Sequence, residues 1–194
     1  EDQLEGVRSI MGPTWKEFSV IRARFIERDG YDIQGNLATE DPELRREFNI
    51  TSGTELIEGE RVIDGTWHGT DGTQEVSVEK DFAERAKLRL GSSVRFFAQG
   101  TTLEARVTSI REVTTTNGLP FFFLVFSPDV LEGLPRSSFG YAYIEDERIP
   151  ALQNELARTY PNISSVPTTQ IIETIGRAVG ALSGAVVATT IPAL

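Results

Sequence analysis

The side chain best suited to acid–base chemistry in this chain is His68, the single histidine of its 194 residues. It stands in the sequence GTWHGTDG, so a hydrolytic site would pair it with a serine and with Asp71. No G-x-S-x-G nucleophile elbow precedes a helix. We therefore expect His68 to be a surface or half-buried loop residue, and we keep a secreted or lipid-linked hydrolase that uses His68 as an alternative.

Carboxylates offer the next candidates for chemistry. Glu145, Asp146 and Glu147 are consecutive, and Asp71 lies close to Glu75, so either group could supply the carboxylate pair of a glycosidase. Acidic runs in a chain with 29 Asp and Glu are more often solvated turns. Zinc would need several nitrogen or sulfur ligands, and the chain has one histidine and no cysteine. The sequence predicts no catalytic, metal-binding or cofactor-binding residue.

Composition narrows the possible partners. The net charge of -10 and the pI near 4.7 would repel a phosphate backbone, and no cluster of lysine or arginine offsets this, so we expect no nucleic-acid partner. The phosphate-binding pattern GxxxxGK[ST] does not occur, so any nucleotide chemistry must belong to another chain. A hydrophobic fraction of 39% with 25% charged residues indicates a globular domain or two small lobes.

The first third of the chain must position the His68 loop. An amphipathic pattern predicts a helix over Gln3–Ile10, and Gly12 and Pro13 would end it. A strand is expected over Phe18–Ile26, before a turn at Asp29 and Gly30. Asp41 as a cap and Pro42 at the first helical position predict a short helix through Glu47, with loops on both sides. Another strand is expected over Arg61–Gly65.

The middle of the chain carries the strongest strand signals. A strand over Val76–Glu79 leads into a helix that begins at Lys80 and is closed by Gly91. Three further strands are expected, and short turns, the first of them at Gln99 and Gly100, would join them into an antiparallel meander. They cover Ser93–Ala98, Thr102–Arg111 and Phe121–Phe126.

The last third alternates between the two kinds of element. Ser127 and Pro128 predict a helix start. A strand over Tyr141–Ile144, a helix over Ile149–Tyr160, a strand over Ile163–Val166 and a helix from Thr168 would follow. This order predicts an α+β fold with a β-rich middle inserted into a smaller split βαβ unit. The tail from Ile175 is nearly uncharged, which fits either the approach to a membrane helix or an amphipathic segment packed on its own domain.

Three stretches between Gly59 and Leu134 resemble the periplasmic core domain of MacB/FtsX-type ABC-transporter permeases, most closely that of the large YbbP-type permeases. They read GERVIDGTWHG, SVEKDFAERAKLRLGSSVRFFAQGTTLEARVTSIREV and LPFFFLVFSPDVLEG. Gly65, Trp67 and the segments Ser77–Glu79 and Val107–Arg111 stand where the family pattern has them. Ser92 departs from it, because the family commonly has Asp there.

The resemblance implies a discontinuous fold. Residues 1–38 and 139–175 would form a porter-like βαβ lobe, with its N-terminal strand missing. Residues 39–138 would form an inserted β-rich, Sabre-like lobe, and residues 176–194 an apolar tail leading to a membrane helix. We accordingly expect a piece of a longer protein, trimmed at both membrane borders.

The resemblance also implies a function. The chain would be an extracytoplasmic (periplasmic) loop of a bacterial inner-membrane protein, without catalysis of its own. It would couple ATP-driven movement of membrane helices to substrate or partner handling outside the cytoplasm. The implied partners are a cytoplasmic ABC ATPase subunit, a second permease copy or an extracytoplasmic protein, and hydrophobic or lipid-like cargo. A freestanding scaffold or adhesion domain is the remaining alternative.

Overall fold

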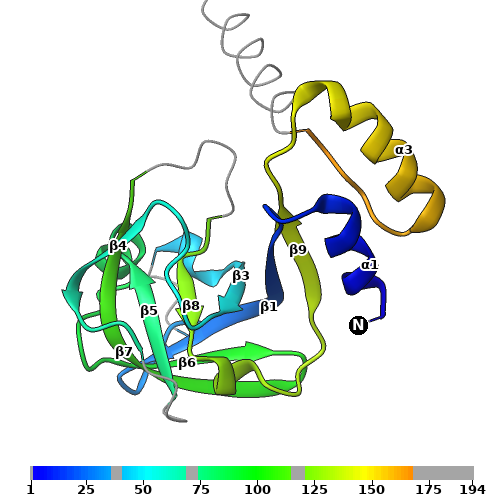
Figure 1. Cartoon of the computed structure of the whole chain (residues 1–194). Helices are drawn as coiled ribbons and strands as arrows, with labels where there is room; N and C mark the ends of the chain where they lie inside the picture. The colour runs from blue at the N-terminus through cyan, green and yellow to red at the C-terminus, as the bar shows by residue number, and fades with distance from the viewer. Residues whose placement is uncertain (1, 36–40, 69–73, 115–120, 168–194) are drawn as a thin grey trace, which may run out of the picture. The chain divides into compact units, whose positions relative to one another are not determined.

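The computed structural model describes residues 2–35, 41–68, 74–114 and 121–167. The chain divides into two compact units (Figure 1). We call Lys16–Tyr141 the barrel unit, and Glu1–Trp15 with Ala142–Leu194 the helical unit. The lobes expected from the sequence have boundaries at 38/39 and 138/139, and their porter-like and Sabre-like assignment stays a prediction. A mixed α+β, strand-rich fold is confirmed.

The elements are, in chain order, α1 (Asp2–Met11), β1 (Lys16–Arg28), β2 (Tyr31–Asp32), η1 (Pro42–Arg45), β3 (Glu47–Ser52), β4 (Glu60–Gly65), β5 (Glu75–Glu79), α2 (Lys80–Arg85), β6 (Ser93–Ala98), β7 (Thr101–Val113), β8 (Leu124–Phe126), η2 (Pro128–Leu131), β9 (Ser137–Tyr141), η3 (Asp146–Arg148) and α3 (Ile149–Thr159).

The strands of the barrel unit close into a ring. Going around it, β1 pairs with β3, β3 with β8, β8 with β5, β5 with β7, β7 with β6, and β6 with β1 again. Most pairs are antiparallel, whereas β3 and β8, and β5 and β7, run parallel. β4 pairs with β7 outside this ring, and β9 pairs with the first half of β1. Closure leaves few open strand edges.

Alternating side chains fill the ring. In β1, Ile21, Ala23 and Phe25 are buried, while Arg22 and Arg24 between them are exposed. The Phe25 ring stacks on Phe96 of β6 with centroids 4.9 Å apart. Burial of so many large apolar side chains is the main driving force for the fold of this unit.

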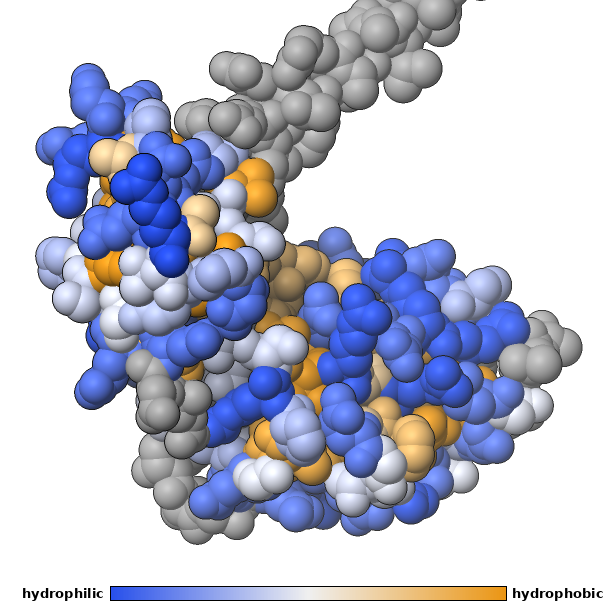
Figure 2. Space-filling view, turned by 90° about the vertical axis from the view of Figure 1, so that its right-hand side faces the viewer, coloured by the Kyte–Doolittle hydropathy of each residue, from blue (hydrophilic) through white to orange (hydrophobic). Residues whose placement is uncertain are grey.

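Some large apolar side chains of the barrel unit also reach the surface. Phe97 of β6 and Phe139 of β9 are both exposed, and Figure 2 shows hydrophobic residues interspersed among hydrophilic ones on the face that it draws. Dispersed apolar side chains are usual at protein surfaces. Their exposure alone therefore does not mark a binding site.

Two tight turns set the strand registers. Asp29 and Gly30 have φ of 47° and 81°, and Gln99 and Gly100 have φ of 51° and 84°. Two successive residues with positive φ are typical of the two-residue hairpin turns whose twist matches that of the strands. Both turns were expected from the sequence, and the strands they join pair antiparallel.

Two strand predictions were wrong. β8 does not extend a meander from β7, because β5 lies beside β7 instead; β8 pairs antiparallel with β5 and parallel with β3. β3 was expected to be helix and loop. Its alternation of exposed Glu47 and Asn49 with buried Phe48 and Ile50 is the strand signal that the helix cap at Asp41 obscured.

The helix caps explain where the short helices begin and end. The Glu43 amide donates to Asp41 Oδ1 at 2.9 Å, which confirms the expected cap, but the helix is a single 3₁₀ turn. α2 ends at Arg85 rather than at Gly91, because Lys87 adopts a left-handed φ of 54° directly after the cap.

The helical unit has a small core of its own. Val7 of α1 and Leu152 and Leu156 of α3 are buried together, which confirms both helices. Gly6 permits close approach, because a Cβ there would lie 1.7 Å from the hydroxyl oxygen of Tyr160.

The elements predicted for the C-terminal third of the chain agree only partly with the structure. The strand expected over Tyr141–Ile144 lies earlier, as β9, and residues 163–166 form no strand. The helix expected from Thr168 and the apolar tail lie outside the described residues. Within the described ranges, no helix has the length and apolar character to cross a membrane.

Candidate functional site

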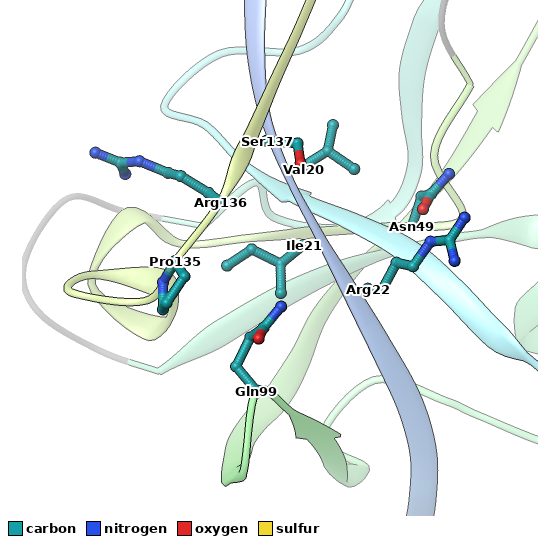
Figure 3. A pocket seen from close by; sticks show the side chains of 8 residues that line it. All are labelled: Val20, Ile21, Arg22, Asn49, Gln99, Pro135, Arg136 and Ser137. Carbon is teal, nitrogen blue, oxygen red and sulfur yellow. The ribbon is translucent and has the colours of Figure 1, made fainter. Parts of the chain in front are cut away.

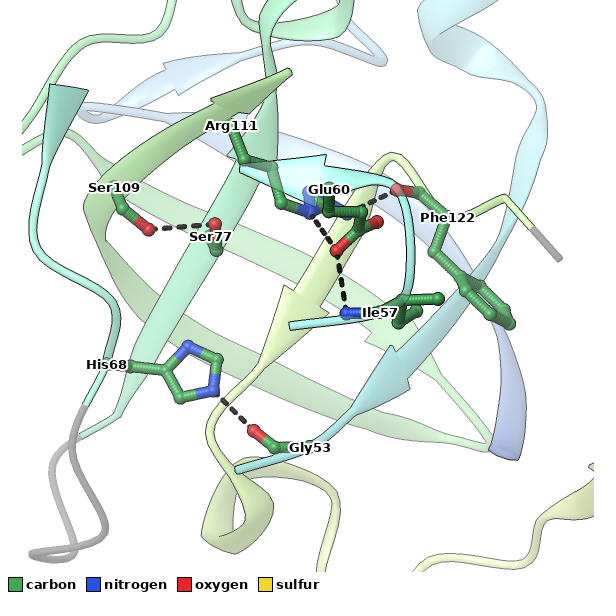
Figure 4. Close-up of polar contacts among 8 residues, drawn as sticks. All are labelled: Gly53, Ile57, Glu60, His68, Ser77, Ser109, Arg111 and Phe122. Carbon is green, nitrogen blue, oxygen red and sulfur yellow. Dashed lines mark hydrogen bonds and ion pairs between the residues drawn. The ribbon is translucent and has the colours of Figure 1, made fainter. Parts of the chain in front are cut away.

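His68 is buried, with 4% of its surface exposed, and not half-buried as the sequence suggested. Its Nε2 donates to the carbonyl oxygen of Gly53 at 2.5 Å (Figure 4). The neighbouring Trp67 ring lies 4.2 Å from the imidazole, and its Nε1 donates to the carbonyl of Thr54 at 3.0 Å. The two aromatic side chains therefore fasten the 66–68 segment to the segment that follows β3.

The protonation state of His68 follows from this setting. Burial lowers its pKa, and the hydrogen bond to Gly53 opposes this more weakly. A neutral ring whose Nε2 proton is donated to a carbonyl leaves Nδ1 as its acceptor, and Nδ1 is buried without a hydrogen-bond partner among the described residues. His68 thus acts as a structural donor, while Asp71, its expected partner in a hydrolase, lies outside the described residues.

A second polar group lies between β4 and β7. The side chains of Arg111 and Glu60 are 0% and 2% exposed, and Arg111 Nε lies 3.1 Å from Glu60 Oε2. The two atoms are close enough for an ion pair, but the N–H of Arg111 Nε does not point at the carboxylate well enough to form a hydrogen bond. Arg111 Nη2 donates to the carbonyl oxygen of Phe122, and the Ile57 amide donates to Glu60 Oε2 at 3.3 Å. The pair joins three chain segments (Figure 4).

Burial shifts both members of this pair. It raises the pKa of Glu60 and lowers the pKa of Arg111, while their mutual attraction opposes both shifts. The charge of Glu79 also favours the charged form of Arg111. The carboxylate of Glu79 also accepts hydrogen bonds from the backbone amides of Asp81 and Phe82, at 2.9 Å each, and so caps α2.

Ser77 of β5 and Ser109 of β7 complete the polar interior. Both are 0% exposed, and Ser109 Oγ donates to Ser77 Oγ at 2.8 Å. These hydroxyls, Glu79 and Arg111 come from the SVE and VTSIR stretches, and Glu60 and His68 come from the GERVIDGTWHG stretch. All three stretches carried the resemblance. The residues that carried the resemblance therefore hold β4, β5, β7 and α2 together. We call five of these buried polar residues the buried polar network, namely Glu60, His68, Ser77, Ser109 and Arg111.

The other acidic candidates that the structure describes belong to different units. Glu145, Asp146 and Glu147 are exposed around the 3₁₀ turn η3 of the helical unit. Glu75 begins β5, and its amide donates to Ser127 Oγ at 3.1 Å. Among the described residues, no group of three or more His, Cys, Asp or Glu is placed to hold a metal ion.

A groove of about 370 Å³ opens on the barrel unit (Figure 3). No sequence motif pointed to it, because its lining comes from four segments that are far apart in the chain. Its lining residues are Val20, Ile21, Arg22, Asn49, Gln99, Pro135, Arg136 and Ser137.

Comparison with known proteins shows similarity over about four-fifths of the chain. No family model matches it. Over 161 residues, 81% of its length, the chain is 29% identical to the uncharacterized ABC transporter permease YbbP of Escherichia coli K12, and it spans 19% of that permease. A crystal structure of a domain assigned to a permease protein of Porphyromonas gingivalis is similar with a TM-score of 0.42 and 8% identity, covering 80% of this chain and 68% of that one.

The sequence match includes the segments that build the buried polar network, since four-fifths of the chain is aligned. The chain is thus homologous to about one fifth of an ABC transporter permease.

Proposed function

We propose that this chain is an extracytoplasmic domain of a MacB/FtsX-type ABC-transporter permease. In this proposal it couples ATP-driven movement of membrane helices to the handling of a substrate or partner outside the cytoplasm. The observation that carries the proposal is the alignment of 81% of the chain with 19% of an ABC transporter permease. A cytoplasmic ATPase would supply the energy, and a second permease copy, an extracytoplasmic protein or lipid-like cargo would be the partner.

The way the chain enters and leaves the barrel unit supports a transmitting role. Lys16 and Tyr141, the first and last residues of this unit, are paired neighbours on β1 and β9. Because the chain enters and leaves the barrel unit at neighbouring positions, a movement of the connecting segments can displace the whole unit without separating its strands. The closed ring of strands and its buried ion pair make that body resistant to deformation.

Location can be tested by labelling. The chain has no cysteine, so Thr102→Cys, at an exposed position of β7, introduces a single thiol into this region of the full-length permease. We expect a membrane-impermeant maleimide to label it in cells whose outer membrane is permeabilised, relative to the unsubstituted permease. Labelling only after lysis would refute the extracytoplasmic assignment.

Coupling can be tested by hydrogen–deuterium exchange of the full permease with its ATPase in nanodiscs. We expect exchange in the connecting segments 12–18 and 139–145 to differ between the nucleotide-free and ATP-bound states, while the core of the ring stays protected in both. Identical exchange in the two states would show that ATP does not move this domain.

A further inference from the structure

The groove lies at a gap in the strand pairing of β1. On one edge, β1 pairs with β3 through residues 20–24. On its other edge, β9 covers residues 16–20 and β6 covers residues 24–28. Within the described part of the chain, residues 21–23 therefore have no neighbouring strand on that edge, and the groove opens beside them (Figure 3).

The backbone of Arg22 points into this gap. The carbonyl of Ser19 accepts a hydrogen bond at 2.7 Å from the Thr51 hydroxyl of β3, so it faces β3. Backbone groups of successive strand residues point to alternate edges, so residues 19, 21 and 23 face β3. The N–H and C=O of Arg22 consequently face the edge where neither β9 nor β6 reaches them.

The charge of the lining contrasts with that of the chain. Arg22 and Arg136 contribute cations and Asn49 and Gln99 contribute amides, whereas none of the described residues lining the groove is acidic. The whole chain carries a net charge of -10. In Figure 3 Arg22 extends to one side of β1 and Arg136 points away from β1 on the other side, while Ile21 and Gln99 lie between β1 and Pro135.

From these features we infer that the groove binds a small oxyanion, a carboxylate or a phosphate, that carries a short apolar group. The oxyanion accepts hydrogen bonds from the Arg22 amide and from the Arg22 guanidinium, which is exposed. The apolar group packs on Ile21 and Pro135. This site goes beyond the proposed transport role and does not depend on it.

A compact ligand fits the gap better than an added peptide strand. Strand addition needs an open edge along which several residues can pair. On this edge of β1, β9 pairs with the residues before the gap and β6 pairs with the residues after it, so the open edge is three residues long. One backbone N–H that faces the gap, beside the exposed guanidinium of Arg22, suits an oxyanion.

The test is an NMR titration of the 194-residue chain with three probes, namely butyl phosphate, inorganic phosphate and 1-butanol. We expect butyl phosphate to shift the amide signals of Arg22 and Gln99 saturably, and 1-butanol to leave them unchanged. Tighter binding of butyl phosphate than of inorganic phosphate would assign the site to lipid-like anions. Equal affinity would assign it to free phosphate and overturn the apolar part of the inference.

Matched variants separate a local site from general charge effects. Arg22→Gln is expected to weaken butyl phosphate binding at least fivefold, and Ser137→Tyr to abolish it by filling the groove. Arg89→Gln, which removes the same charge from an exposed position outside the groove, is expected to leave the affinity unchanged. The inference is overturned if neither anion shifts the Arg22 amide, or if Arg89→Gln weakens binding as much as Arg22→Gln.

Discussion

The barrel unit holds two arginine-containing polar regions of opposite character. In the buried polar network, Arg111 is fully enclosed and neutralised by Glu60, and its guanidinium is fixed to a backbone carbonyl. In the groove, Arg22 and Arg136 are exposed beside an unpaired stretch of β1. The same kind of side chain is therefore enclosed and paired with a carboxylate in one region and lies at the surface in the other.

The difference comes from the strand neighbours. Arg111 belongs to β7, which has partners along both edges: β4 and β5 beside Arg111, and β6 farther along. Arg22 sits where β9 has ended and β6 has not begun. A substitution in the network should therefore cost folding free energy, whereas one in the groove should leave folding nearly unchanged.

The largest expected effect is that of Arg111→Met. It leaves the carboxylate of Glu60 buried without its cation, which should cost about 3–5 kcal/mol of unfolding free energy. The matched change Arg22→Met should cost less than about 0.5 kcal/mol, because that side chain is exposed. Urea unfolding followed by circular dichroism measures both. Equal losses of unfolding free energy in the two variants would contradict the view that only the buried arginine stabilises the fold.

The next largest effect concerns the backbone beside the network. Gly65 has a φ of 77°, and a Cβ there would lie 2.2 Å from the carbonyl oxygen of Thr108. Gly91 has a similar φ of 84°, but a Cβ added there would meet nothing within 4 Å. Gly91→Ala should cost about 1 kcal/mol from φ strain alone, and Gly65→Ala about 2–4 kcal/mol from strain and overpacking.

This pair of glycine variants also has a clear contrary outcome. Similar losses of unfolding free energy in the two variants would mean that the chain near Gly65 moves aside easily, and that β4 is not held tightly against β7.

A smaller effect is expected from the hydroxyl pair. Ser77→Ala leaves the Ser109 hydroxyl buried without its partner, which should cost about 1–3 kcal/mol. Replacing both serines by alanine removes the unpaired group as well, so the double variant should be less destabilised than the sum of the single variants. Additive losses in the unfolding free energy would show that the two hydroxyls do not depend on each other.

Much of the fold was predictable because local patterns determine it. The Asp29 and Gly30 turn, the helices α1 and α3 and the cap at Asp41 each rest on a few consecutive residues. The neighbours of β8 were not predictable, because strand order depends on which long-range pairs bury the most surface. β3 was missed for a different reason, because the helix cap at Asp41 obscured the alternation of its exposed and buried residues.

The two polar regions differed in how visible they were to sequence reasoning. The network residues lie in contiguous stretches that resemble a family, although their structural role became evident only from the Glu60 and Arg111 contact. The groove has no such stretch, since Arg22, Gln99 and Arg136 meet only when the ring closes. The burial of His68 was also underestimated, because its hydrogen bond to Gly53 crosses from one loop to another.

The smallest expected effect is a pH dependence that tests His68 as a member of the buried network. Burial lowers its pKa below the ordinary value of about 6.5, so the folded protein resists protonation that the unfolded chain accepts. Stability from this source is present above about pH 6.5 and is lost as the pH falls through the folded-state pKa.

His68→Gln keeps an N–H donor for Gly53 but does not titrate. We expect the variant to lose less unfolding free energy than the parent protein between about pH 7.5 and pH 5.5, measured by urea titration. Other titrating groups cancel in that comparison, so an identical loss would place His68 in contact with solvent, like the arginines of the groove.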